Sequence, residues 1–188
     1  MEDKIKSHIE LKLLLLLLLS TSFSTFALEL DFWSSESFCY ESPNVQNRNG
    51  VLYLPNQQEP FTGENLCVFT NGQHHSKGNV INGLGDGKWT WWYESGMNRQ
   101  ETIYKDGKKD GKQTAWYKKN GQINHEGSFK DGKKDGNWTY WKENGQIRSE
   151  LNWKDGKKDG NWTYWKENGQ IRSESNWKDG ECISGDCV

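Results

Sequence analysis

The sequence predicts an all-β protein: an elongated antiparallel meander of tandem β-hairpin repeats, each about 24 residues long. The first observation is a close internal copy, because residues 136–156 and 160–180 differ over 21 positions only at Leu151 and Ser175. The second is that Asn-Gly and Asp-Gly dipeptides recur between short alternating runs, which is the strongest short-range signal for a hairpin. Together they predict a string of hairpins joined in sequence order.

Three more diverged copies precede these two. They begin about 24 residues apart, and the 111–135 copy is one residue longer than the others. The extra residue predicts a bulge or a longer turn at Lys118-Lys119-Asn120-Gly121. The five predicted repeats are 63–86, 87–110, 111–135, 136–159 and 160–183, opened by Gly63, Gly87, Gly111, Gly136 and Gly160.

The 136–159 repeat indicates how each hairpin forms. Asn144-Gly145 separates its two runs, and both residue types accept the positive φ angles that a type I′ turn needs. Asp-Gly pairs such as Asp155-Gly156 are expected to reverse the chain in the same way between one hairpin and the next. With a two-residue loop, the expected pairs are Trp138 with Leu151, Tyr140 with Ser149, and Trp141 with Arg148.

Alternation of side chains gives each hairpin two faces. The face that we expect to be packed carries Trp138, Tyr140, Ile147, Leu151 and Trp153. The other face carries Thr139, Trp141, Glu143, Arg148 and Glu150. Aliphatic residues are scarce in the repeats, so the 11 tryptophans of the chain are expected to supply most of the core.

One aromatic row on the second face is a candidate for ligand binding. Trp141 is expected opposite Arg148 with a cation–π contact, and two other repeats have the same pairing, whereas Trp116 has no arginine partner. The candidate binding residues are Trp92, Trp116, Trp141 and Trp165, with Arg99, Arg148 and Arg172.

The two ends of the chain differ from the repeats. Residues 1–27 are typical of a secretory signal peptide, with lysines before the leucine run and a small residue, Ala27, at the cleavage position. This predicts export to the periplasm or the extracellular space, and the alternative is an uncleaved membrane anchor. Residues 28–62 are expected to form an irregular segment and a hairpin that caps the sheet, and residues 184–188 a C-terminal tail.

Four cysteines in an exported chain predict disulfides. Of the three possible pairings, the meander allows one. About nine strands separate Cys67 from Cys182, roughly 40 Å at about 4.8 Å per strand, whereas a disulfide needs Cα atoms within about 7 Å. The expected bonds are Cys39–Cys67 and Cys182–Cys187, one at each end of the array.

No cluster of residues in the sequence indicates a reaction. Asp155 and Asp159 are spaced as in a calcium loop, but Lys157 and Lys166 stand where carboxylates are needed. Residues 63–175 carry 19 Lys and Arg against 15 Asp and Glu, a net charge of +4 with mixed signs, which is too weak to indicate nucleic-acid binding. We therefore predict no catalytic residues, no metal and no cofactor, and a protein that is not an enzyme.

The repeats resemble the MORN-repeat-variant family, which includes antitoxins of the YwqK type. The resemblance rests on the cores 138–146 and 162–170 and the linkers 105–111, 130–136 and 154–160, and it spans about 48–180. It implies a non-catalytic binding surface and, for some relatives, neutralisation of a toxin. The leading hypothesis is an exported scaffold with a protein partner such as a toxin. The alternatives are an envelope glycan- or choline-binding module that uses the tryptophan row, and association with a lipid surface.

Overall fold

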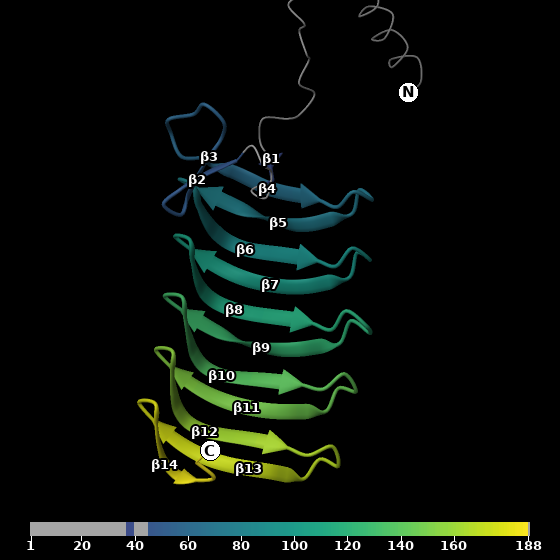
Figure 1. Cartoon of the computed structure of the whole chain (residues 1–188), viewed down its shortest axis with the longest axis vertical. Coiled ribbons are helices and arrows are strands. Elements are labelled where there is room, and N and C mark those ends of the chain that lie inside the picture. Colours follow the sequence, from purple (N-terminus) through teal and green to yellow (C-terminus); the bar gives the residue numbers. More distant parts are fainter. Residues whose placement is uncertain (1–36, 40–44, 188) are drawn as a thin grey trace, which may run out of the picture. The chain divides into compact units, whose positions relative to one another are not determined.

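The computed structural model describes residues 37–39 and 45–187, and every regular element in these ranges is a β-strand (Figure 1). The all-β prediction is confirmed. The predicted signal segment 1–27 lies outside the described residues, as do most of residues 28–44. No helix in the described part of the chain is long and apolar enough to cross a membrane.

Twelve strands form one sheet, in which every strand from β4 onwards pairs with the next strand in the sequence (Figure 1). These pairs are antiparallel, so the predicted meander of hairpins is confirmed, while β1 pairs with β4 in parallel. The strands are β1 (Ser37–Phe38), β4 (Gly63–Val68), β5 (His74–Ile81), β6 (Leu84–Trp92), β7 (Asn98–Lys105), β8 (Lys108–Trp116), β9 (Ile123–Lys130), β10 (Lys133–Trp141), β11 (Ile147–Lys154), β12 (Lys157–Trp165), β13 (Ile171–Lys178) and β14 (Glu181–Gly185).

The N-terminal hairpin, β2 (Gln46–Arg48) and β3 (Val51–Tyr53), forms a separate two-stranded sheet. The hairpin expected in residues 28–62 is thus present, but its strands do not pair with those of the main sheet. Instead, the backbone N–H of Leu52 donates to the carbonyl of Gly83 at 3.0 Å, and the Leu52 side chain packs against the cluster around Trp89. The N-terminal edge of the main sheet is covered by β1.

The two kinds of turn in each repeat have different conformations. In the Asp-Gly turns between hairpins, such as Asp155-Gly156, both residues have positive φ (50° and 80°), so the type I′ prediction is confirmed. At Asn144-Gly145 only the glycine does, with φ of 83°, and its N–H donates to the carbonyl of Lys142 at 2.9 Å. This loop is a type I turn followed by a left-handed glycine, so the type I′ prediction is wrong here.

The longer loop changes the register at the end of each hairpin. The observed pairs are Trp138 with Leu151, Tyr140 with Ser149, and Trp141 with Ile147. The first two agree with the sequence prediction, but Arg148 is now the extra residue of a β-bulge. The predicted Trp141–Arg148 pair is therefore wrong, and so is the placement of Ile147 on the packed face.

The extra residue of the 111–135 repeat is taken up in its turn. The N–H of Gly121 donates to the carbonyl of Tyr117 at 3.0 Å, one residue further apart than the same bond between Gly145 and Lys142. The longer turn predicted from the sequence is confirmed.

The core is made of tryptophans packed flat against the sheet backbone. Trp138 is only 1% exposed and lies on Gly127, where a Cβ atom would overlap the indole. Its Nε1–H donates to the carbonyl of Ser128 at 3.0 Å. Trp89 is bound over Gly78 in the same way. The two buried clusters are Phe61, Val80 and Trp89, and Trp138, Leu151 and Trp162.

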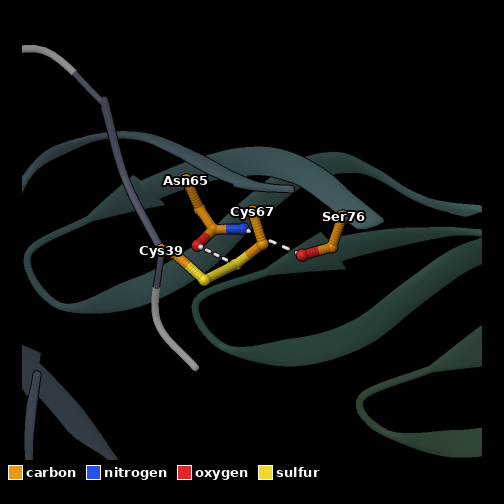
Figure 2. The surroundings of a disulfide bond; sticks show 4 residues. All are labelled: Cys39, Asn65, Cys67 and Ser76. Atoms are coloured by element: carbon orange, nitrogen blue, oxygen red, sulfur yellow. Dashed lines mark hydrogen bonds between the residues drawn. A yellow bond between two sulfur atoms is a disulfide. The ribbon is translucent and has the colours of Figure 1, made fainter. Parts of the chain in front are cut away.

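A disulfide lies at each end of the sheet, and both predicted pairings are confirmed. Cys39–Cys67 joins the residue after β1 to β4; Figure 2 shows this bond beside Asn65 and Ser76, whose side chains are fully buried. Cys182–Cys187 closes a short loop at the other end. There the chain adds one strand, β14, to the last predicted hairpin.

Candidate functional site

The four tryptophans singled out in the sequence occupy equivalent places in the fold. Trp92, Trp116, Trp141 and Trp165 end β6, β8, β10 and β12, and all four are half-buried. Trp138 and Tyr140 stack on the packed side at a ring distance of 6.2 Å, so alternation directs Trp141 to the other side of the sheet. The tryptophans therefore form a row with a spacing of two strands, about 10 Å.

Isoleucines extend this row. The pairs are Trp116 with Ile123, Trp141 with Ile147, and Trp165 with Ile171. We call these six residues the Trp–Ile strip; Trp92, by contrast, pairs with Asn98. Ile147 and Ile171 are 37% and 50% exposed, so the strip presents apolar side chains to solvent. The sequence indicated the tryptophans but not the isoleucines, because only the bulge brings them to this side.

A polar row lies beside the Trp–Ile strip. Threonine and glutamate alternate across eight strands, in the order Thr90, Glu101, Thr114, Glu126, Thr139, Glu150, Thr163 and Glu174. Lys88 and Lys112 form ion pairs with the first two glutamates at 2.8 and 2.9 Å. Asparagine replaces these lysines in the last two repeats, where Glu150 and Glu174 have no ion pair with any described residue. The strip is thus bordered by negative charge at its C-terminal end.

The predicted arginines do not share the Trp–Ile strip. The guanidinium of Arg148 lies 5.5 Å from the ring centroid of Tyr140, which is on the packed side. Arg148 and Arg172 are the bulged residues of consecutive repeats, and both line one groove of about 410 Å³. We call it the Tyr–Arg groove, and its lining is Tyr140, Arg148, Ser149, Leu151, Tyr164, Trp165 and Arg172. Arg99 is the exposed, bulged residue of the 87–110 hairpin and is not part of this groove.

Lysines make cation–π contacts in the packed clusters. Lys134 Nζ lies 4.2 Å from the Trp138 ring, and Lys158 Nζ lies 4.3 Å from Trp162 and 3.7 Å from Trp177. In the sequence these lysines look like turn residues of the Lys-Asp-Gly linkers. They reach the indoles because β10 and β12 begin before the glycines that open the repeats.

The 111–135 repeat has a polar network where its neighbours have tryptophan. Gln113 replaces the tryptophan, and its Oε1 accepts hydrogen bonds from Lys109 Nζ at 2.9 Å and Thr102 Oγ1 at 3.2 Å. The amide Nε2 then donates to His125 Nε2 at 3.1 Å, and His125 Nδ1 donates to Asn124 Oδ1 at 2.6 Å. This arrangement requires a neutral imidazole with its proton on Nδ1. The network was not predicted from the sequence.

Burial lowers the pKa of His125, and the positive charges of Lys134, Arg148 and Lys109 lower it further. We therefore expect the protein to lose stability as the pH falls below about 6.5, where the unfolded chain takes up a proton before the folded one does. Urea unfolding at about pH 7.5 and about pH 5.5 measures the loss. It should be larger for the wild type than for His125→Gln; an equal loss in both proteins would contradict the prediction.

Comparison with known proteins assigns the repeats. Residues 85–108, 134–155 and 158–179 match the family model described as MORN repeat variant. These segments are MORN-variant repeats. The resemblance noted in the sequence is confirmed for these three segments, and repeats of this kind indicate a repeat protein with a binding role.

No curated protein matches the chain. Among solved structures, one chain of the "Crystal structure of GtfA/B complex bound to UDP and GlcNAc" matches at 13% identity and a TM-score of 0.24. The match covers 74% of this chain and 26% of that one, so this chain spans about a quarter of the other's length. A likeness at this level carries no argument about function.

Proposed function

We propose that this chain is a non-catalytic, exported repeat protein that binds another protein through the Trp–Ile strip. The observation that carries the proposal is the regular row of three Trp–Ile pairs on β8 to β13. Tryptophan is enriched among the residues that dominate binding energy at protein interfaces. The strip is not needed for the two buried clusters, because these are built from the residues of the opposite face.

The strip also suggests the chemistry of the partner. Its apolar contacts repeat about every 10 Å along a line, which suits one extended or helical segment. The carboxylates of Glu150 and Glu174, which form no ion pair within the described residues, lie beside its C-terminal half, so lysine or arginine next to the apolar residues of the partner would be favoured.

Export is supported by the two disulfides, because such bonds persist in oxidising compartments. The signal-like segment 1–27 is the sequence evidence for the same conclusion. The antitoxin role of some MORN-variant proteins makes an exported or incoming toxin the first partner to test.

The test is capture of a partner by the purified, disulfide-bonded protein from an envelope extract, followed by measurement of its affinity. Replacing both Ile147 and Ile171 by glutamate should weaken binding by roughly tenfold or more, because it places charge in the centre of the contact. Ile183→Glu is the matched control, since Ile183 is 61% exposed on β14 and outside the strip. Equal affinity of the double variant and the control would refute the proposal, as would the absence of any partner.

A further inference from the structure

We propose that the Tyr–Arg groove is a second binding site, for a small carboxylate with a ring-shaped body. The groove lies between β10 and β12 on the packed side of the sheet, and Trp165 is the one lining residue that also belongs to the Trp–Ile strip. The proposal goes beyond protein binding by the strip and does not depend on it.

The groove lies where one small residue, Ser149, stands between two tyrosines on neighbouring strands. On the packed side the cross-strand neighbours run Trp91, Gln100, Ala115, His125, Tyr140, Ser149, Tyr164 and Ser173. Within the described strands, Ser149 is the only small residue of this row with an aromatic residue on both sides. In the preceding repeat the equivalent residue is His125, and its ring fills the corresponding space, 5.5 Å from the Tyr140 ring. The space beside Ser149 is therefore open.

The dimensions of the groove suit one or two rings. Its walls, Tyr140 and Tyr164, belong to strands that lie about 10 Å apart. Its floor is formed by Ser149 and Leu151, which are 3% and 8% exposed. The volume of about 410 Å³ falls within the roughly 300–1,000 Å³ of typical small-molecule sites. Tyrosine faces stack on sugar or aromatic rings, so the walls favour a flat, ring-shaped ligand.

The charge of the groove selects an anion. Arg148 and Arg172 line it from consecutive repeats, no acidic residue lines it, and neither guanidinium has an ion-pair partner in the described part of the chain. A guanidinium binds a carboxylate through two parallel hydrogen bonds. The same charge disfavours a cation, so choline is not expected to bind here. Burial and the neighbouring Tyr140 raise the pKa of Tyr164, which keeps its hydroxyl protonated and able to donate to a ligand oxygen.

Calorimetric titration of the intact, disulfide-bonded protein tests the site with two carboxylates that carry different kinds of ring. Digalacturonate represents a sugar acid and 4-hydroxybenzoate an aromatic acid; lactose, choline and inorganic phosphate are the comparison ligands. We expect saturable binding of at least one of the two acids. The acid that binds shows whether the ligand carries a sugar ring or an aromatic ring. If neither acid binds at concentrations up to about 10 mM, the Kd is too weak for specific recognition, and the proposal is overturned.

Variants localise the site. Replacing both Arg148 and Arg172 by glutamine should weaken binding roughly tenfold or more, because two charge-assisted contacts are lost. Arg99→Gln is the matched control, since Arg99 occupies the same bulge in a hairpin without the groove. Ser149→His should also abolish binding by filling the groove as His125 does in the preceding repeat. Unchanged affinity of the double arginine variant overturns the proposal, and so does binding of lactose or phosphate as tight as that of the acids.

Discussion

Replacing Trp138 by alanine is expected to lower the free energy of unfolding by about 3–5 kcal/mol, the largest effect of any single side chain in the repeats. Trp138 is 1% exposed, and its indole contacts the Phe129 ring at 5.0 Å and the Lys134 ammonium at 4.2 Å. Truncation leaves a cavity over Gly127 and leaves the Ser128 carbonyl without the indole N–H that it accepts. Urea unfolding followed by circular dichroism measures the loss.

Trp141→Ala is the matched control for Trp138→Ala. Trp141 is only half-buried and ends β10 on the opposite side of the sheet, so its removal should cost about 1 kcal/mol. Equal losses in the two variants would show that both faces are packed, which contradicts the assignment of the Trp–Ile strip to binding. The pair of variants therefore separates the structural tryptophans from the candidate binding tryptophans.

The register of the hairpins could be predicted from the sequence up to the point where the loop begins. Trp138 pairs with Leu151 and Tyr140 with Ser149 because alternation and burial fix both positions. The prediction fails one residue later, at Trp141. Asn-Gly is compatible both with a two-residue loop and with the end of a longer one, and only the latter leaves Arg148 bulged.

Contacts between repeats contribute to this choice of loop, and local sequence does not show them. The Tyr117 hydroxyl donates to the carbonyl of Trp141 at 2.7 Å, and the Lys142 ammonium donates to the carbonyl of Lys166 at 2.7 Å. Each of these bonds holds the end of one hairpin against the next, over a sequence distance of 24 residues. Within the loop itself, Asn144 Oδ1 accepts the N–H of Gln146 at 3.0 Å.

Because local sequence does not show the bulge, it also could not predict that the candidate tryptophans and arginines would separate into two groups. The sequence placed tryptophans and arginines together because it assigned both to one face of a regular hairpin. The bulge moves Arg148 beside Tyr140 and turns Ile147 towards the Trp141 side. The disulfides were predictable because that argument used only the order of the strands and their spacing, which a bulge does not change.

Removing the Cys39–Cys67 bond, by replacing both cysteines with serine, is expected to destabilise the protein by about 3–4 kcal/mol. The bond closes a loop with a sequence separation of 28 and ties the two-residue strand β1 to β4. Two residues of parallel pairing are too few to hold an edge strand without this link. Urea unfolding of the variant against the oxidised wild type measures the effect.

The second disulfide supplies the comparison. Cys182 and Cys187 are only five residues apart, so replacing both by serine should cost about 2 kcal/mol by the same loop-closure argument. Loss of β1 has a further consequence that loss of the C-terminal bond lacks, because the N–H and C=O groups of β4 that now pair with Ser37 and Phe38 become a free sheet edge. The Cys39/Cys67 variant should therefore exchange the amide hydrogens of β4 faster and self-associate at high concentration. If the C-terminal variant were the less stable of the two, the N-terminal bond would not be the one that protects the sheet.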